Sequence, residues 1–362
     1  MTRDEIIAVL SKIKDPDLHR DIVSLGFVKK VDITDHKIDV EIQLTTPACP
    51  VRDDMKTQAV EAIKGLGFMG TINVAMTSQV VGHANQNRDQ VLPGVRNTIA
   101  VASGKGGVGK STVAVNLAAA LAKDGAKVGI VDADVYGPSL PLMLGVTERP
   151  DTEPIDEKRF RIRPVEKFGI KLMSIGFLVD TETPMIWRGP MASGAVKQFL
   201  TDVTWGDLDY MIFDLPPGTG DVQLTLVQTI PLTGAVIVTT PQDVSLADVR
   251  RGVRMFQKVN VPLFGIVENM SYFVCSHCGQ REEIFSHGGG KTTAEKFGVP
   301  FLGEIPIYTP IRIGGDTGRP IVISEPESEQ AQMIQSVARR LAAQISITNM
   351  TAADKPKIEI AI

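Results

Sequence analysis

The sequence predicts an α/β protein whose mostly parallel β-sheet is covered by helices on both faces, preceded by a small α+β domain. Strand-like and helix-like runs alternate over residues 95–346, as parallel strands joined by crossover helices require. A glycine-rich turn at 104–109 joins one apolar run to an alanine-rich helical pattern. The 362 residues favour two domains over one, and residues 1–82 have a pattern of their own.

The first domain, residues 1–82, begins with a capping box. Thr2 and Glu5 stand three residues apart, and apolar residues at helical spacing follow them. Two strands around a turn, a second helix and a third strand complete the expected α+β unit, at 27–33, 38–44, 50–66 and 71–76. The polar, unpatterned residues 83–94 are expected to form a linker.

The second domain, residues 95–346, is expected to alternate strands with helices. Strands are predicted at 99–103, 127–131, 170–174, 210–214, 235–239 and 263–268. Helices are predicted at 111–124, 191–201, 222–229, 246–259 and 328–345, with residues 347–362 left as a C-terminal tail. In such sheets ligands bind at the carboxyl ends of the strands.

Composition and charge narrow the class of protein. The chain is 43% hydrophobic and has a formal net charge of −4, which gives no reason to expect nucleic acid as the main partner. The N-terminus lacks the pattern of a secretion signal, and no apolar run is long enough to cross a membrane. Three cysteines, an odd number, favour a reducing compartment. We therefore expect a cytoplasmic protein without a membrane partner.

The glycine-rich turn matches the P-loop spacing GxxxxGK[ST] from Gly104 to Ser111. Glycines let backbone N–H groups curl around phosphate oxygens, and the following helix presents its positive end to the same anion. Lys110 is expected to neutralise the β- and γ-phosphates, and Ser111 to hold Mg²⁺. The predicted nucleotide contacts are Gly104, Lys105, Gly106, Gly107, Val108, Gly109, Lys110, Ser111 and Thr112.

A second lysine in this loop, Lys105, has no obvious place if Lys110 occupies the phosphate site of its own chain. One hypothesis is that Lys105 reaches the nucleotide of a second subunit. The alternative is a solvated loop lysine.

Acidic residues follow several predicted strands. Asp214 comes after four apolar residues, where a Walker-B carboxylate holds Mg²⁺ or its water. Asp134 is expected to orient the attacking water. Asp132 and Asp221 are further candidates at this edge of the sheet, with capping of the next helix as the alternative role for each. Asn269, after the strand at 263–268, is a candidate for a hydrogen bond with the adenine edge.

Two of the three cysteines form a C-x-x-C pair, Cys275 and Cys278, with Gly279 permitting a tight turn. One pair supplies two thiolates, while tetrahedral zinc or an iron–sulfur cluster takes about four ligands. Two copies of the chain would supply the other two, so we expect a shared site in a homodimer. Spacing leaves cluster and zinc open, and a redox dithiol is the weakest alternative. His277 and His287 are minor candidate ligands.

The third cysteine, Cys49, stands between a strand and a helix pattern in Thr45–Pro50. Pro50 suits the first position of a helix, which would put Cys49 at the N-cap with a lowered thiol pKa. A reactive thiolate, a metal ligand and a half-buried cap residue all remain open.

These motifs together resemble the Mrp/ApbC family of iron–sulfur cluster carrier ATPases, relatives of MinD and ParA. The resemblance covers nearly the whole chain. It includes the deviant Walker A sequence GKGGVGKS at 104–111, and the segments 132–139, 187–191, 214–221, 241–248, 268–270 and 313–320. The first domain is similar to the iron–sulfur assembly domain fused ahead of many bacterial members, with its motif at Thr45–Pro50.

The resemblance implies a homodimer that binds ATP and Mg²⁺ and holds a [4Fe–4S] cluster between Cys275 and Cys278 of both subunits. It implies transfer of that cluster to apo-proteins. Lys105 would be the signature lysine that crosses the dimer, Lys110 the P-loop lysine, Asp134 the residue that positions water and Asp214 the support of the metal. Cytosolic eukaryotic relatives carry an additional N-terminal cysteine cluster, which this sequence lacks.

We therefore expect an ATP-hydrolysing carrier of iron–sulfur clusters. Two alternatives stay open. One is a MinD/ParA-like positioning ATPase that acts on membrane or DNA, although the residues 346–362 are too weakly charged for either partner. The other is a nucleotide switch with a structural zinc at the dimer interface.

Overall fold

The computed structural model describes residues 1–83, 91–154, 160–178, 189–275 and 277–353. The chain forms two compact units, one of residues 1–81 with 342–362 and one of residues 82–341. Each unit is described here by itself. The expected boundary at 346 therefore differs from the observed grouping, because the last helix contributes residues to both units.

The first unit is an α+β layer of two helices on a three-stranded sheet. Its elements are α1 (Arg3–Leu10), β1 (Val28–Ile33), β2 (Lys37–Leu44), α2 (Arg52–Lys64) and β3 (Thr71–Ser78). The predicted capping box is confirmed, since the Thr2 hydroxyl accepts from the Glu5 N–H and the Glu5 carboxylate accepts from the Thr2 N–H. β2 runs antiparallel to β1 and parallel to β3.

Alternation along β2 shows why this sheet has one covered face. Ile38, Val40, Ile42 and Leu44 are buried, while the residues between them are exposed or half-buried. Met55, Ala59 and Ile63 of α2 pack against the covered face at helical spacing.

The expected position of Cys49 at the N-cap is wrong. α2 begins at Arg52, and the N-cap residue is Val51, so Cys49 lies two residues before the cap. The first helical hydrogen bond runs from the Met55 N–H to the Val51 carbonyl at 2.9 Å. The side chain of Cys49 is half-buried and packs against the core of the first unit.

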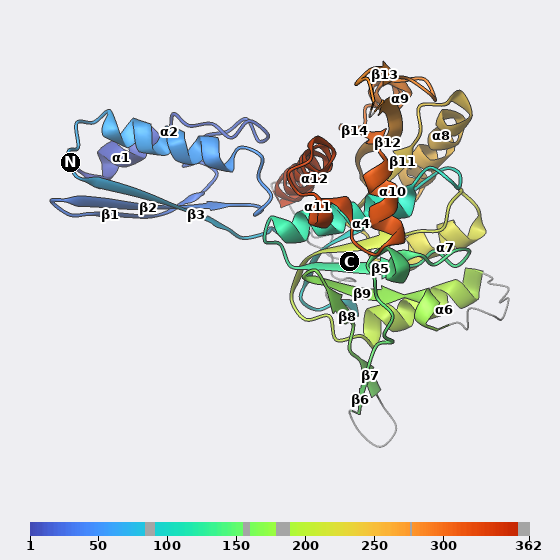
Figure 1. Ribbon diagram of the computed structural model, residues 1–362. Coiled ribbons are helices and arrows are strands. Elements are labelled where there is room, and N and C mark those ends of the chain that lie inside the picture. The colour runs from blue at the N-terminus through green and yellow to red at the C-terminus, as the bar shows by residue number, and fades with distance from the viewer. Residues whose placement is uncertain (84–90, 155–159, 179–188, 276, 354–362) are drawn as a thin grey trace, which may run out of the picture. The chain divides into compact units, whose positions relative to one another are not determined.

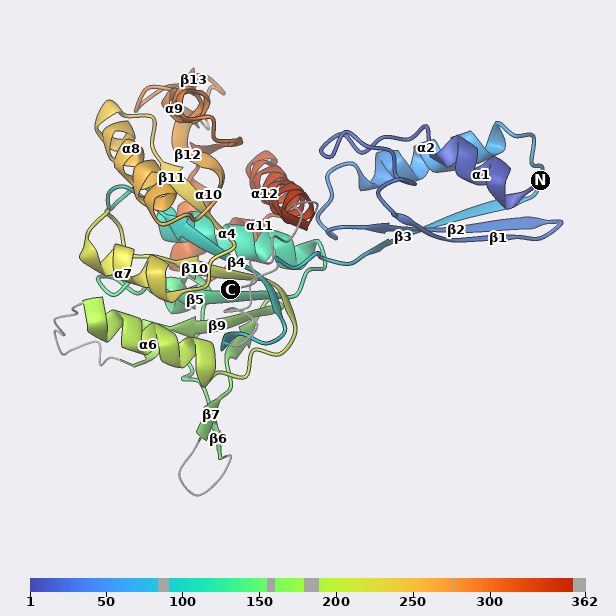
Figure 2. The ribbon, with the colours of Figure 1, turned by 180° about the vertical axis from the view of Figure 1, so that it is seen from behind.

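The second unit is built on a mostly parallel sheet (Figures 1 and 2). Within its described residues the sheet has nine strands in the order β13-β12-β11-β4-β10-β5-β9-β8, with β14 also paired to β12. Only β8 and β13 run antiparallel to their neighbours. The strands are β4 (Val95–Ala102), β5 (Val128–Asp132), β8 (Val165–Lys167), β9 (Ile170–Ser174), β10 (Leu208–Asp214), β11 (Gly234–Thr239), β12 (Leu263–Val274), β13 (Arg281–Glu282) and β14 (Phe301–Ile307). A separate ribbon pairs β6 (Thr152–Pro154) with β7 (Phe160–Ile162).

Helices cover both faces of this sheet, as predicted. Side chains of α6 (Gly189–Thr201), α7 (Asp221–Thr229), α8 (Asp243–Lys258) and α9 (Gly289–Phe297) share one hydrophobic cluster with the strands. On the opposite face α4 (Lys110–Lys123) contacts the strands together with α5 (Leu140–Met143) and α11 (Ile321–Ser324). There α12 (Glu329–Ala353) donates from the Gln335 amide to the Ala120 carbonyl at 2.9 Å. α10 (Thr309–Asp316) contacts α5 and α11, and a 3₁₀ turn spans Ile175–Phe177.

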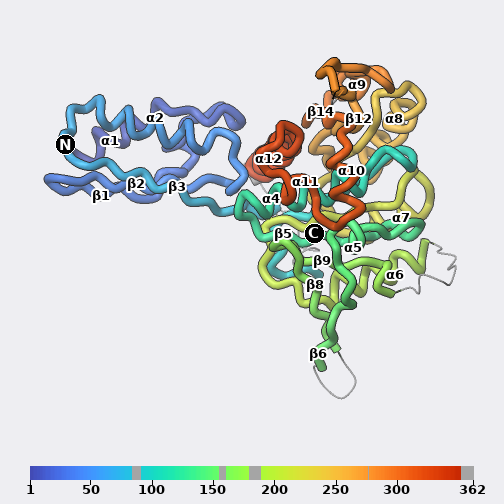
Figure 3. Tube along the Cα trace, in the orientation of Figure 1, coloured from blue at the N-terminus to red at the C-terminus, as the bar shows by residue number. Residues whose placement is uncertain are grey.

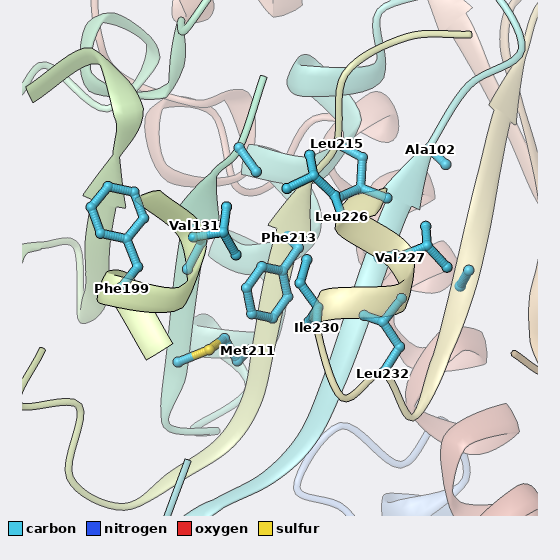
Figure 4. Close-up of a cluster of buried hydrophobic side chains, with 14 of the residues drawn as sticks. Ala102, Val131, Phe199, Met211, Phe213, Leu215, Leu226, Val227, Ile230 and Leu232 are labelled. Carbon is cyan, nitrogen blue, oxygen red and sulfur yellow. The ribbon is translucent and has the colours of Figure 1, made fainter. Parts of the chain in front are cut away.

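Figure 4 shows why the central strands are apolar along their whole length. Phe213 of β10 and Val131 of β5 meet Phe199 of α6 and Leu226 of α7 in one cluster, and all four are fully buried. A parallel strand covered on both faces has no solvent side, so its sequence is a continuous apolar run rather than an alternation.

Five elements depart from the predictions: β12, β13, β14, α9 and α12. β12 continues six residues beyond the expected end at Glu268, and β14 was not predicted. Residues 281–291, which the sequence predicts as a loop, contain β13 and the beginning of α9. α12 continues to Ala353, so the first residues of the expected tail at 347–362 are helical. Residues 84–90 of the predicted linker at 83–94, and residues 354–362 of the predicted tail, lie outside the described residues.

Candidate functional site

The predicted P-loop occupies the turn between β4 and α4, at the carboxyl end of the sheet. Gly107 and Gly109 have φ angles of +80° and +79°, in the left-handed region that favours glycine. Gly109 is the N-cap residue of α4, so the free N–H groups of the helix begin at the loop. The loop is therefore shaped to surround an anion at a helix N-terminus.

Lys110 lies in a buried ionic cluster with two carboxylates. Its ammonium is 2.6 Å from Asp214 Oδ1 and 3.2 Å from Asp134 Oδ2, and it donates to the Ser111 hydroxyl at 3.3 Å. β10 ends on Asp214, and Asp134 follows β5, the strand beside it. The structure thus brings together three of the four predicted catalytic residues.

Burial and charge act in opposite directions on this cluster. Desolvation of the ammonium lowers the pKa of Lys110, but the charges of Asp214 and Asp134 outweigh it and raise the pKa above its ordinary value. Burial raises the pKa of Asp214, and the ammonium of Lys110 opposes that rise. The lysine is therefore held as a cation directly beneath the loop.

Asp132 has a structural role in the resting chain. Its Oδ2 accepts from the Leu140 N–H at 3.1 Å and from the Ser174 hydroxyl at 3.0 Å, which ties α5 and β9 to the end of β5. Complete burial and the neighbouring charge of Asp214 raise the pKa of Asp132 to about 7. Asp221, the other candidate cap, is the first residue of α7 and follows its N-cap Gly220.

A cavity of about 500 Å³ opens over the P-loop. The loop, Ser111 and Thr112 form one wall, with Asp134 and Pro217 beside them. Further lining residues come from α5, from α10 and from the position after Asn269. They are Leu142, Met143, Met270, Ile311, Arg312 and Gly315, and the sequence analysis did not predict them as part of the site. The family motif at 313–320 could have predicted part of this lining, because Gly315 and Asp316 belong to it. The cavity combines an anion-binding end with a partly apolar side, as a nucleoside phosphate requires.

Asn269 contacts the loop itself. Its amide Nδ2 donates to the Val108 carbonyl at 2.9 Å, and a Cβ added to Gly109 would collide with the same nitrogen. Asn269 is buried at the point where β12 passes the loop. Its contact with an adenine edge stays a prediction.

Lys105 is not among the residues that line the cavity of its own chain. Its ammonium lies 3.4 Å from Oε1 of Gln242, the residue before α8, and the side chain is half-buried. This position is at the edge of the loop and leaves the predicted role across a subunit boundary untested.

The residues around Ser111 fit Mg²⁺. Within the described chain, Asp214 Oδ2 is fully buried and accepts no hydrogen bond, so one carboxylate oxygen is available beside the Ser111 hydroxyl. A hydroxyl and a carboxylate are the oxygen ligands that Mg²⁺ takes with nucleotide phosphates.

The cysteine pair lies in the turn between β12 and β13, at the other end of β12. The Gly279 N–H donates to the Cys275 carbonyl at 2.8 Å, and Gly279 has a φ of +72°, so the turn is tight as predicted. Cys275 is half-buried and Cys278 is exposed. Hydrogen bonds from the backbone N–H groups of Cys278 and then His277 lower the pKa of the Cys275 thiol.

A polar cluster packs beside this hairpin, between β12, β14 and the beginning of α9. Oxygen and nitrogen atoms of Glu268, His287 and Glu304 lie within 4.8 Å of one another. Buried Glu268 already accepts from the N–H groups of Gly288 and Gly290, at 3.0 and 2.5 Å. We interpret this cluster as the cap of α9, and His287 as the partner of Glu304 at 2.7 Å.

Trp187 and Arg188 of the motif at 187–191 lie outside the described residues. Across the part of the chain that is described, no helix combines the length and the apolar character needed to span a bilayer.

Comparison with protein families gives two matches. Residues 94–342 match the family described as the NUBPL iron-transfer P-loop NTPase, and residues 3–74 match the iron–sulfur cluster assembly protein family. The chain is 45% identical over 348 residues to the iron–sulfur cluster carrier protein of Synechocystis, covering 96% of this chain and 99% of the relative.

Solved structures resemble the second unit. A nucleotide-binding protein of Archaeoglobus fulgidus, determined in complex with ADP, is 40% identical and superposes with a TM-score of 0.58, covering 68% of this chain and 94% of that one. MinD of Pyrococcus horikoshii, determined with Mg-ADP, is 25% identical with a TM-score of 0.51 over 67% of this chain and 94% of its own. The fold, the loop and the family matches agree, and the chain belongs to the iron–sulfur cluster carrier family of P-loop NTPases.

Proposed function

We propose that this chain binds an iron–sulfur cluster between two copies of itself and transfers it to apo-proteins, in a cycle that binds and hydrolyses ATP. The observation that carries the proposal is the cysteine hairpin at the end of β12, where Cys275 is half-buried and Cys278 is exposed. Two thiolates are half of a [4Fe–4S] coordination sphere, and a two-fold related copy supplies the other half.

The cluster is cargo in this proposal, so the hairpin has to release it as well as hold it. An exposed turn with few contacts suits that task, because a recipient protein can approach the thiolates directly. A structural zinc site would instead enclose its metal with four protein ligands, which leaves no open position for a recipient.

The P-loop cavity performs the ATPase part of the cycle. The loop and Lys110 bind the β- and γ-phosphates, while Ser111 and Asp214 hold Mg²⁺ directly or through its water. When bound, Mg²⁺ neutralises phosphate charge. Asp134 stands 3.2 Å from the Lys110 ammonium, where its carboxylate can hold and orient a water beside the γ-phosphate.

Lys105 acts on the nucleotide of the partner subunit in this proposal. Support comes from its place at the edge of the loop, outside the cavity that the same chain forms. A cation supplied by a partner stabilises the charge of the transferring phosphoryl group. Hydrolysis then depends on dimer formation.

Anaerobic reconstitution followed by transfer tests the function. Iron and labile sulfide are measured per chain, and transfer is followed by reactivation of an apo-enzyme that requires a [4Fe–4S] cluster. The chain is expected to take up about four iron atoms per two copies and to reactivate the acceptor. Lys110→Ala should slow transfer in the presence of ATP.

Cys49→Ser is the matched control, because it removes a thiol from the first unit and leaves the hairpin intact. It should bind as much cluster as the unaltered chain. Zinc retained without uptake of iron, or a reconstituted protein that reactivates no acceptor, would overturn the proposal.

A further inference from the structure

β12 joins the nucleotide loop to the cysteine hairpin within one chain. Asn269 contacts the loop, and Cys275 follows the last residue of the strand. The six steps from Asn269 to Cys275 span at most about 20 Å when the chain is extended. Figure 3 lets the reader follow this stretch from β12 to α9.

At the loop end, β12 meets the nucleotide site through two neighbouring residues. The Asn269 amide donates to the Val108 carbonyl, and Met270 lines the cavity with its Cε 3.6 Å from the position of a Cβ on Gly109. A nucleotide that fills the cavity and reorganises the P-loop therefore acts directly on this pair.

Immediately beyond Asn269 the strand is irregular. Pairing with β14 matches Asn269 to Ile305 and then Phe273 to Ile307, so four steps along β12 oppose two along β14. Met270 has a φ of +55°, which is uncommon for a residue with a side chain. Pairing with β11 ends at Glu268. Residues 270–272 thus form a bulge whose backbone is held by neither regular ladder.

At the hairpin end, the bulge is connected to the turn that carries the thiols. The guanidinium of Arg281 stacks on the Tyr272 ring, with the Arg281 Cζ atom 3.8 Å from the centroid of the ring. Arg281 pairs with Val274 in the β12–β13 ladder, one residue before Cys275. A rotation of the backbone at 270–272 therefore moves the base of the hairpin.

We propose that the bulge at residues 270–272 is a hinge through which nucleotide in the P-loop changes how the hairpin presents Cys275 and Cys278. The inference rests on the proposed function for its purpose, which is to couple ATP to the hold on a cluster. A ligand shifts a two-state element only if it contacts the two states differently. Met270 supplies that contact, because it belongs both to the cavity and to the bulge.

The test measures thiol reactivity without any cluster. In the Cys49→Ser background only Cys275 and Cys278 remain, and their rate of alkylation by iodoacetamide is measured with and without saturating MgADP. The rate should change by at least about fivefold, the lower range of coupling between two sites. Sedimentation under the same conditions shows whether the association state is unchanged.

Met270→Gly is the decisive variant, because glycine adopts positive φ freely and removes the side chain from the cavity. The response to MgADP should fall below about twofold while calorimetry still shows ADP bound. Asn260→Gly is the matched control, since Asn260 has a φ of +56° in the turn after α8 and lines no part of the cavity. It should respond as the unaltered chain does.

A full response in Met270→Gly, or no response of the unaltered chain at saturating MgADP, would overturn the hinge. Failure of the proposed function is a separate result. If alkylation responds to MgADP but the chain takes up no iron, the hinge is supported and the carrier role is refuted. If the chain takes up and transfers a cluster but alkylation does not respond to MgADP, the carrier role is supported and the hinge is refuted.

Discussion

The P-loop and the cysteine hairpin are served by the same strand, yet they are built in opposite ways. Around the loop, Lys110, Asp134 and Asp214 are buried and bonded to one another. At the hairpin, Cys278 is exposed and Cys275 half-buried, held by a short turn. The comparison teaches that the nucleotide loop is preorganised by buried partners from its own chain, whereas the cysteine pair offers only two thiols, half of the ligands that a tetrahedral zinc or a [4Fe–4S] cluster takes.

The largest expected effect is at the hairpin. Replacing both thiols, in Cys275→Ser/Cys278→Ser, should abolish cluster uptake, because hydroxyl groups do not replace thiolates as iron ligands. Nucleotide binding should stay unchanged, since the P-loop cavity contains neither residue. Iron and sulfide analysis and ADP calorimetry measure the two properties. Loss of both together would mean that the two ends of β12 are not separate sites.

The next effect concerns the two loop lysines. Lys105→Ala and Lys110→Ala should each lower ATP turnover by about 10²–10³-fold, as loss of one preorganised donor does. An equal mixture of the two variants should recover about a quarter of the activity, because half of the dimers then contain one complete site. Turnover is measured after mixing at several protein concentrations. No recovery would place Lys105 at the nucleotide of its own chain.

A third prediction concerns the contribution of the buried Lys110–Asp214 pair to the stability of the second unit. Lys110→Met should lower the free energy of unfolding of the second unit by about 3–5 kcal/mol, because Asp214 is left buried without its counter-ion. The double variant Lys110→Met/Asp214→Asn should recover part of that loss. Urea unfolding followed by the fluorescence of Trp205, which is buried in the second unit, measures both.

Lys105→Met is the control for this stability prediction. It changes a half-buried lysine in the same loop, and a change within about 0.5 kcal/mol is expected for a position without buried partners. Equal destabilisation by both substitutions would show that the loop as a whole, rather than the buried cluster, responds to the loss of a lysine.

The smallest effect tests reciprocity along β12. If bound nucleotide changes the affinity of the hairpin for a metal ion, that metal ion must change the affinity for nucleotide by the same factor, which we expect to be about fivefold. Cd²⁺ is the probe, and the Kd for ADP is measured with and without it. Met270→Gly and Cys275→Ser/Cys278→Ser should both remove the change. An unchanged Kd for ADP in a chain whose Cd²⁺ affinity changes with MgADP would contradict this linkage.

The sequence was sufficient to predict the central strands, because a continuous apolar run such as residues 210–213 fits a parallel strand that is covered on both faces. It was insufficient for β12 and β14. Glu268, Asn269 and Ser271 interrupt the apolar run, so the strand was predicted to end there, whereas their side chains are bonded inside the fold. Pro306 and Glu304 conceal β14 in the same way.

In the candidate site too, some residues could be predicted from the sequence and others could not. The P-loop and its acids carry local motifs, so their proximity followed from strand ends alone. The wall formed by Leu142 and Ile311 comes from two short helices far apart along the chain, and no period or spacing connects them. The N-cap prediction for Cys49 was wrong because a proline permits a helix start without fixing it, and Val51 takes the cap instead.

The continuous helix α12 has a practical consequence for dissecting this protein. Its 25 residues contribute to both compact units, so the two halves of the chain are joined by backbone at two places. After a single protease cut between residues 82 and 94, residues 1–81 would be a separate polypeptide, and only non-covalent packing would keep them with residues 342–353 of α12 in the first unit. Truncated proteins that end before Ala342 would remove the part of α12 that belongs with the first unit.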